Sequence, residues 1–213
     1  MLSQRTEYLL EAVGCHLTQK QALLLPCTAR YILVTGGDQA GKSMLASKKF
    51  LQELVPDIAR ARSAGYRFPL IYWLVAADYD RTDQEFNYIK HDLEMLGLMH
   101  KASKRVDPGF IEISGGPDGD PVIAIVKTKS GKDYRTLAKE APMGIIGCEA
   151  SQLDLDSYLR LVARTAPHRA WMFLTGTMES SMGWYPQLRR AWETGQDDKR
   201  SFSLPSYSNH YLY

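Results

Sequence analysis

The chain has 213 residues, enough for one large domain or two small ones, and 45% of them are hydrophobic, as in a globular protein with a substantial core. No apolar run approaches the roughly 20 residues that cross a bilayer, and the charged segment 1–15 indicates a helix instead of a signal peptide, so we expect no membrane association. A formal net charge of +2 does not by itself indicate a nucleic-acid-binding protein, and three widely spaced cysteines without metal-ligand spacing indicate a reducing compartment.

Helical and strand patterns alternate along the chain. "YILVT" (31–35) is rich in β-branched residues and precedes two glycines, which predicts a buried strand. Residues 81–99 place apolar side chains at helical spacing. By these criteria helices are expected over residues 3–14, 17–25, 42–55, 81–99, 154–165 and 184–195, and buried strands over 31–35, 69–77, 143–150 and 170–177. The alternation predicts an α/β fold with a mainly parallel central sheet and helices on both faces.

An antiparallel extension is expected in the middle of the chain. "GFIEISGG" (109–116) and "PVIAIVKTK" (121–129) surround a Gly-Pro-Asp-Gly turn, which predicts a hairpin. Residues 100–105 and 127–135 are basic and are expected to lie largely in loops, either as solvated surface or in contact with a phosphate backbone. The tail 201–213 is expected to be extended.

Residues 36–43, "GGDQAGKS", have the spacing of a phosphate loop and stand between an expected strand and an expected helix. Glycines let backbone N–H groups approach a phosphate, and the helix N-terminus adds partial positive charge. Lys42 is expected to reach the terminal phosphates, and the Ser43 hydroxyl to ligate Mg²⁺. The residues expected to contact the nucleotide are Gly36, Gly37, Asp38, Gln39, Ala40, Gly41, Lys42 and Ser43. The motif predicts a three-layer phosphate-loop NTPase fold.

Two further strand ends carry groups suited to hydrolysis. Glu149 could orient or activate water and share the Mg²⁺ with Ser43, or it could simply be a charged residue that leaves a core strand. Cys148 precedes it and is a poor partner for Mg²⁺, which favours oxygen ligands. In "FLTGT", Thr175 and Thr177 could sense the γ-phosphate or the attacking water, or could form an ordinary strand-to-loop turn.

Taken in order, "GGDQAGKS", "GIIGCEASQ", "FLTGT" and "WETGQDDKRSFSLPSYSN" resemble the ATPase domain of viral large terminases, the DNA-packaging motors of tailed bacteriophages. The likeness covers nearly the whole chain, and the ordered set is far more specific than the phosphate loop alone. It implies ATP and Mg²⁺ as ligands, with Lys42 and Ser43 holding phosphate and ion and Glu149 as the catalytic glutamate. The motif that couples γ-phosphate loss to DNA movement would be Thr175, Gly176 and Thr177.

The resemblance also points to the base of the nucleotide. "LTQKQ" (17–21) resembles an adenine-recognising glutamine motif, with Gln21 as first choice and Gln19 as second; a solvent-facing helix residue is the alternative for Gln21. Two positions depart from the family pattern. Asp38 stands where relatives often carry arginine, and Cys148 where they carry aspartate, and both changes could slow hydrolysis.

Such motors act as rings in which a neighbouring subunit commonly supplies an arginine. Arg135 is the first candidate for this catalytic arginine, with Lys139 and Arg164 behind it, and an ordinary surface charge is the alternative for each. An arginine supplied between subunits predicts weak ATPase activity for a single chain, which we expect to be a monomer in isolation.

The resemblance implies one ATPase domain over residues 1–213, with the nuclease domain of large terminases absent and a linker beginning at about residue 201. No nuclease activity is expected, because acidic residues such as those at 196–198 lack a supporting fold. The implied partners are double-stranded DNA, the portal protein and the small terminase subunit, in the host cytoplasm at the procapsid portal.

Two other functions stay open on the sequence. One is a helicase-like ATPase that depends on nucleic acid, and the other is a nucleotide-gated assembly module with little turnover, which Cys148 favours. A small-molecule kinase fits less well, since no arginine-rich lid is recognisable.

Overall fold

The computed structural model describes residues 2–104, 108–114, 121–132, 135–178, 182–195 and 198–206. They contain one open eight-stranded sheet with the order β3-β4-β5-β2-β6-β7-β1-β8. The strands are β1 (Tyr31–Gly36), β2 (Leu70–Ala76), β3 (Met99–Ser103), β4 (Phe110–Ser114), β5 (Val122–Ser130), β6 (Gly144–Gly147), β7 (Trp171–Gly176) and β8 (Lys199–Leu204). Neighbours from β5 to β8 in this order pair in parallel, and β3, β4 and β5 pair antiparallel. The expected mainly parallel sheet with an antiparallel extension is confirmed.

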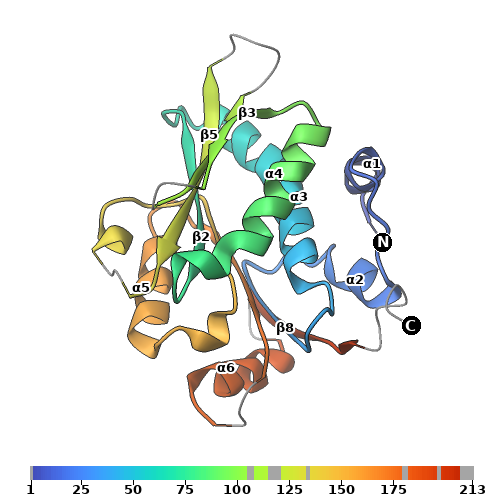
Figure 1. The fold of residues 1–213 in the computed structure, drawn as a ribbon, viewed down its shortest axis with the longest axis vertical. Coiled ribbons are helices and arrows are strands. Elements are labelled where there is room, and N and C mark those ends of the chain that lie inside the picture. The colour runs from blue at the N-terminus through green and yellow to red at the C-terminus, as the bar shows by residue number, and fades with distance from the viewer. Residues whose placement is uncertain are drawn as a thin grey trace.

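Helices cover both faces of this sheet (Figure 1). The α-helices are α1 (Gln4–Ala12), α2 (Gln19–Leu24), α3 (Lys42–Ser63), α4 (Asp83–Met95), α5 (Leu155–Thr165) and α6 (Trp184–Glu193). Three short 3₁₀ helices are η1 (Tyr79–Thr82), η2 (Thr136–Ala138) and η3 (Ala150–Gln152). None of the helices in the described part of the chain is both long and apolar enough to span a bilayer.

Alternate residues of the strands divide the apolar interior into two cores. On β1, Ile32 and Val34 belong to the core shared with α1 to α4, whereas Leu33 belongs to the core shared with α5 and α6. This alternation follows from the two-residue repeat of a strand, and it explains why the central strands are apolar on both faces. The three-layer arrangement expected from the sequence is therefore confirmed.

Helix α3 is longer than the sequence pattern predicted. We expected it to end near residue 55, but it continues through Pro56 to Ser63. The buried carboxylate of Asp57 accepts hydrogen bonds from the Tyr72 hydroxyl at 3.1 Å and from Trp171 Nε1 at 3.0 Å, which anchors the helix to the sheet beyond the proline. Such tertiary contacts offset the backbone hydrogen bond that a proline removes.

The sequence analysis missed strand β3. Residues 100–103 were expected in a basic loop but pair with β4 at the edge of the sheet, so that expectation was wrong. The Gly-Pro-Asp-Gly turn of the hairpin lies outside the described residues, as do residues 105, 133–134, 196–197 and 207–213. The extended tail was expected, and its residues up to Leu204 form β8, which adds to the sheet beside β1 at the position where a linker was predicted to begin.

Candidate nucleotide-binding site

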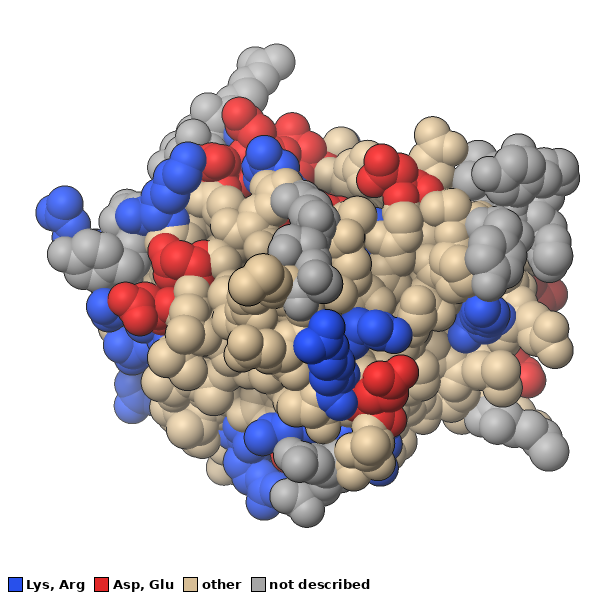
Figure 2. Space-filling view, turned by 90° about the horizontal axis from the view of Figure 1, so that it is seen from below, with Lys and Arg blue, Asp and Glu red and all other residues tan. Residues whose placement is uncertain are grey.

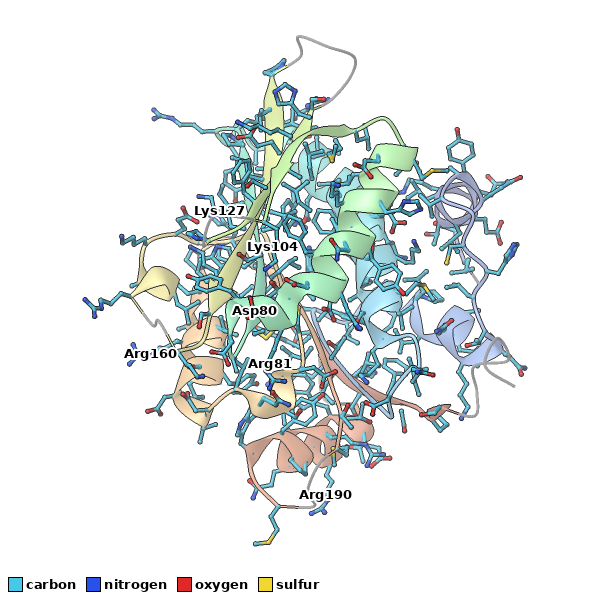
Figure 3. All side chains as sticks on the ribbon, in the orientation of Figure 1. Asp80, Arg81, Lys104, Lys127, Arg160 and Arg190 are labelled. Atoms are coloured by element: carbon cyan, nitrogen blue, oxygen red, sulfur yellow. The ribbon has the colours of Figure 1, made fainter. Side chains whose placement is uncertain are left out.

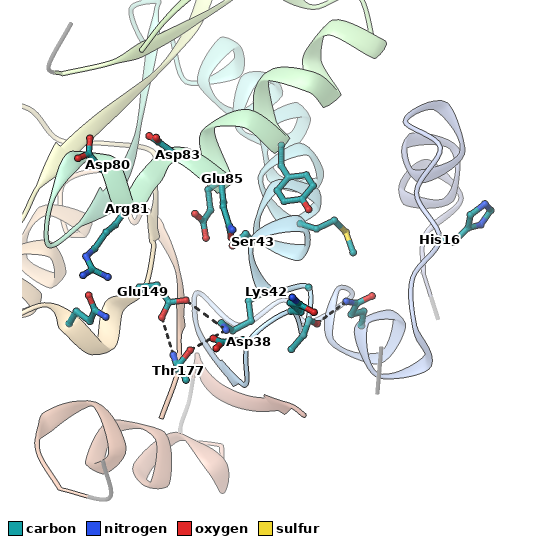
Figure 4. A pocket seen from close by; sticks show the side chains of 18 residues that line it. His16, Asp38, Lys42, Ser43, Asp80, Arg81, Asp83, Glu85, Glu149 and Thr177 are labelled. Atoms are coloured by element: carbon teal, nitrogen blue, oxygen red, sulfur yellow. Dashed lines mark hydrogen bonds and ion pairs between the residues drawn. The ribbon is translucent and has the colours of Figure 1, made fainter. Parts of the chain in front are cut away.

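A cleft of about 980 Å³ opens where β1, β6 and β7 end (Figure 4). Its size is at the upper end of the range typical of small-molecule sites. It is lined by His16, Gln21, residues 38–44, Asp80, Arg81, Asp83, Gln84, Glu85, Tyr88, Glu149, Gln152 and Thr177. The carboxyl ends of parallel strands are the usual place for ligands in open α/β sheets, and the sequence-predicted phosphate loop forms one wall of the cleft.

The phosphate loop turns sharply between β1 and α3. Gln39 (φ 59°) and Gly41 (φ 79°) both have left-handed backbone conformations. A Cβ on Gly41 would lie 2.6 Å from Nε2 of Gln21, so conformation and space both favour glycine there. The loop leads directly into α3, whose first residue is Lys42. Backbone N–H groups at this helix start are available to an anion, as the motif requires.

The end of β8 supports the other side of the loop. A side chain on Gly36 would collide with the carbonyl oxygen of Leu204, and one on Gly37 with the hydroxyl of Ser206. The Ser206 hydroxyl also donates to the Asp38 carbonyl at 2.9 Å. The tail of the described chain therefore fixes the backbone of the phosphate loop, a contact that the sequence pattern did not reveal.

Lys42, Glu149 and Thr177 come together from three different parts of the chain. The buried Lys42 ammonium donates to the carbonyl oxygens of Gly36 and Gly37 at 3.2 and 2.9 Å and to Thr177 Oγ1 at 3.3 Å. It lies 3.7 Å from Glu149 Oε1, and Glu149 Oε2 accepts a hydrogen bond from the Thr177 amide at 3.2 Å. The left-handed backbone of Glu149 (φ 43°, ψ 50°) is a strained conformation of the kind found at functional sites.

Ser43 lies opposite residues of α4. Its hydroxyl donates to Gln84 Oε1 at 3.2 Å and also contacts the carboxylate of Glu85. Glu85 is only 3% exposed, and burial raises the pKa of its carboxyl, although the hydrogen bond from Ser43 acts in the opposite direction. The sequence analysis did not identify either α4 residue, since no motif surrounds them. The sequence gives one indication of a functional role for Gln84 and Glu85: they lie at the start of the helix that follows a buried parallel strand.

The donor set of the cleft fits Mg²⁺. The Ser43 hydroxyl and the carboxylates of Glu149 and Glu85 are hard oxygen donors, which this ion prefers. Cys148 does not fit, because its thiol is fully buried and burial raises its pKa well above the usual value, so that it stays protonated. Within the described ranges, no group of three or more His, Cys, Asp or Glu residues is arranged to hold a metal alone. This suits an ion bound largely through phosphate oxygens.

Gln21 is part of the protein interior. It is 2% exposed, its Oε1 accepts from the Thr18 amide at 2.9 Å, and its Nε2 donates to the Ala40 carbonyl at 3.4 Å. Thr18 and Gln21 form a reciprocal capping box at the start of α2. The solvent-facing alternative for Gln21 is therefore wrong, while adenine recognition stays a prediction. Gln19 is exposed and is not among the residues that line the cleft.

The three residues of the predicted coupling motif differ in position. The buried Thr175 hydroxyl donates to the Gly147 carbonyl at 3.1 Å and so joins β7 to β6, away from the cleft. Gly176 leaves room for Tyr185 of α6, whose hydroxyl would lie 2.7 Å from a Cβ at that position. Thr177 alone of the three lines the cleft. A part in coupling stays a prediction for all three.

The arginine that lines the cleft is not one of those expected from the sequence. Arg81 projects from η1 into the cleft (Figures 3 and 4). Arg135 and Lys139 are exposed next to η2, and Arg164 is half-buried on α5; none of the three lines the cleft of its own chain. Cationic groups on the described walls therefore include Lys42 and Arg81, and the exposed Asp38 lies on the same loop as Lys42.

Comparisons with known proteins identify solved structures that share this fold. No protein-family model matches the sequence, and no curated protein sequence matches it. The ATPase domain of the large terminase of Thermus phage P74-26 matches the structure with a TM-score of 0.71 at 16% identity, over 91% of this chain and 83% of that chain. A mutant of the same domain gives a TM-score of 0.71 at 17% identity over the same shares.

The structure of a longer terminase chain shares the same fold. The large terminase of a thermophilic bacteriophage, in complex with ADP, gives a TM-score of 0.71 at 11% identity, over 93% of this chain and 48% of that chain. The chain thus spans about half the length of that terminase. At such low identities the likeness concerns the fold, and it confirms the fold class expected from the motifs. The protein has the phosphate-loop NTPase-like fold of the ATPase domains of phage large terminases.

Proposed function

We propose that this chain is the ATP-hydrolysing motor domain of a phage large terminase, which translocates double-stranded DNA into a procapsid. The observation that carries the proposal is the cluster of Lys42, Glu149 and Thr177, which joins a phosphate loop to the ends of two neighbouring strands. Similar structures were solved in complex with ADP and with ATP-γ-S, which supports a nucleotide as the ligand of the cleft.

Different residues of the cleft would have different roles in hydrolysis. The backbone of the loop and the Lys42 ammonium would bind the terminal phosphates, and Ser43 and Glu149 would hold Mg²⁺. The bound ion would neutralise charge on the phosphate oxygens. Glu149 orients a water molecule and accepts its proton. The Thr177 amide fixes one oxygen of this carboxylate and leaves the other toward Lys42, so the geometry of the base depends on the end of β7.

The same contacts offer a route for coupling. Thr177 donates its amide to Glu149 and accepts from Lys42 through its hydroxyl, so loss of the γ-phosphate changes the partners of both groups. Thr177 follows β7, which packs against Tyr185 of α6 at Gly176. We infer that the end of β7 transmits the state of the nucleotide to α6, on the side of the molecule shown in Figure 2.

The partners in this proposal are double-stranded DNA, the portal protein and the small terminase subunit, at the procapsid portal in the host cytoplasm. On the face in Figure 2, Lys and Arg side chains are interspersed with acidic ones, so charge alone does not assign the DNA contact to that face. The chain would be a monomer in isolation and form a ring during packaging. Exposed Arg135 would then serve the cleft of a neighbouring subunit.

Translocation can be tested on the assembled protein. The chain is assembled on portal rings, and release of a triplex-forming oligonucleotide from double-stranded DNA is measured with ATP. Release that requires both ATP and the portal supports the motor. Strand separation without translocation would favour the helicase-like ATPase instead.

The ring is tested by mixing subunits. Arg135→Ala should leave the weak activity of the isolated chain unchanged and lower that of the assembled ring. Adding chains that carry Glu149→Gln but retain Arg135 should partly restore it if the arginine acts between subunits. Lys139→Ala is a matched control from the same exposed segment.

One observation favours a second function. Cys148 places an uncharged thiol where a carboxylate would strengthen the ion site. A nucleotide-gated assembly module would bind ATP tightly and assemble with it, yet hydrolyse it slowly even in the ring. Single-turnover hydrolysis by the assembled chain distinguishes this module from the motor.

A further inference from the structure

The first residue after strand β6 brings no carboxylate to the ion site. The residue that follows it, Cys148, is fully buried, and its thiol lies 4.0 Å from the carbonyl oxygen of Ile146, to which it donates. Thiols are also poor ligands for Mg²⁺. On its own, therefore, this strand end leaves the phosphate loop with Glu149 as its one carboxylate.

The α4 wall holds a carboxylate next to that thiol. Glu85 contacts both Ser43 and Cys148, and Figure 4 shows its side chain reaching from α4 toward the loop, beside Ser43. It lies among the residues that line the cleft, although its own surface is only 3% exposed. Glu85 thus contacts the Ser43 hydroxyl and the Cys148 thiol from α4, on the other side of the site from the end of β6.

The surroundings of Glu85 set it apart from an ordinary acidic residue in a first helical turn. Asp83, in the same turn, is 53% exposed and pairs with Lys104 at 2.9 Å, as a surface charge does. Glu85 is buried, and no ion pair joins it to a Lys or Arg within the described part of the chain. A buried carboxylate normally has a cationic partner or coordinates a metal.

We propose that Glu85 supplies, from α4, the carboxylate for Mg²⁺ that β6 lacks at Cys148. The inference rests on the proposed function, since the ion accompanies the nucleotide. Glu85 would then join Ser43 and Glu149 around the ion from the α4 wall, so that Glu149 is not the one carboxylate on the ion and can also act on water. The contact between the α4 wall and the loop, present here as the hydrogen bond from Ser43 to Gln84 at 3.2 Å, becomes part of ion binding.

The test compares binding of a non-hydrolysable fluorescent ATP analogue in EDTA and across a Mg²⁺ titration. Glu85→Gln keeps the size of the side chain and removes its charge. It should raise the Mg²⁺ concentration at half-saturation by about 10- to 100-fold, as expected for the loss of a metal-site partner, and change the affinity in EDTA by less than about threefold. Glu94→Gln removes a carboxylate from the same helix but outside the cleft lining, and should leave the Mg²⁺ titration within about twofold of wild type.

A second substitution tests whether a carboxylate at position 148 can replace the carboxylate of Glu85. Cys148→Asp in the Glu85→Gln background returns a carboxylate to the end of β6 and should recover most of the lost Mg²⁺ affinity. Electron paramagnetic resonance of bound Mn²⁺ gives a second readout, because removing the Glu85 carboxylate should change the spectrum of the nucleotide complex and Glu94→Gln should not.

The outcomes separate this inference from the proposed function. Nucleotide binding with the same Mg²⁺ dependence in wild type and Glu85→Gln overturns the inference alone. No binding by wild type, with or without Mg²⁺, overturns both. If Glu85→Gln does not fold, Glu85→Asp takes its place: the shorter carboxylate should weaken the Mg²⁺ dependence several-fold, and an unchanged titration overturns the inference.

Discussion

One wall of the cleft is the phosphate loop, where a single short segment fixes Lys42 and Ser43. The opposite wall is built by η1 and α4, which bring Arg81 and Glu85 from a later part of the chain. Backbone conformation defines the first wall, including the left-handed Gly41 at the start of α3. Side-chain contacts define the second. In the proposed function the loop wall binds the phosphates, and the α4 wall sets the charge that surrounds them.

The largest expected effect separates binding from hydrolysis at Glu149, which lies next to the loop wall at the end of β6. Glu149→Gln should lower ATP turnover by about 10³-fold, because the amide cannot accept a proton from water. Nucleotide affinity should change by less than about threefold. Phosphate release and equilibrium binding measure the two effects. Glu193→Gln, on the exposed part of α6, is the control, and unchanged turnover in Glu149→Gln would remove Glu149 from the mechanism.

Lys42→Ala tests binding at the same wall. The ammonium is held by two loop carbonyls and the Thr177 hydroxyl, so its position is fixed by the loop backbone and the end of β7. Affinity for ATP should fall about 100-fold, equivalent to about 2.7 kcal/mol. Calorimetry on the variant and on Lys90→Ala checks this, because Lys90 pairs with Glu94 on α4 and does not line the cleft. Equal affinities would contradict the assignment of the phosphate loop.

Arg81→Ala tests the α4 wall. Turnover should fall roughly tenfold, because a charged hydrogen bond to a phosphate contributes about 1.5 to 3 kcal/mol and Arg81 is partly solvated. The loss should exceed that for Arg62→Ala, on the exposed end of α3. If Arg81→Ala hydrolyses ATP normally in the isolated chain and in the ring, the charge balance of the site comes from elsewhere, and Arg135 of a neighbour becomes the principal candidate.

The smallest expected effect concerns Gln21, which links α2 to the phosphate loop. Gln21→Ala removes half of the capping box and should cost about 1 kcal/mol of stability, measured by urea unfolding. Affinities for ATP and GTP should fall by the same few-fold factor if Gln21 only supports the loop. A loss of affinity for ATP but not for GTP would instead show that the amide of Gln21 recognises adenine.

Much of the fold follows from local patterns. The buried strands β1, β2, β6 and β7 are short apolar runs bounded by turn residues, and their alternation with helices left few topologies open. The pattern failed at β3 and at the end of α3. β3 is a basic edge strand whose residues need only pair with β4, and α3 continues past Pro56 because Asp57 is anchored by Tyr72 and Trp171.

The sequence by itself determined the phosphate loop, since eight consecutive residues specify the turn, the helix start, and the positions of Lys42 and Ser43. It also determined that Glu149 and Thr177 end neighbouring parallel strands. Only the tertiary structure decided what faces them. Arg81, Glu85 and the tail beside Gly37 reach the loop through packing between elements distant in the chain, and such contacts leave no periodic or spaced pattern in the sequence.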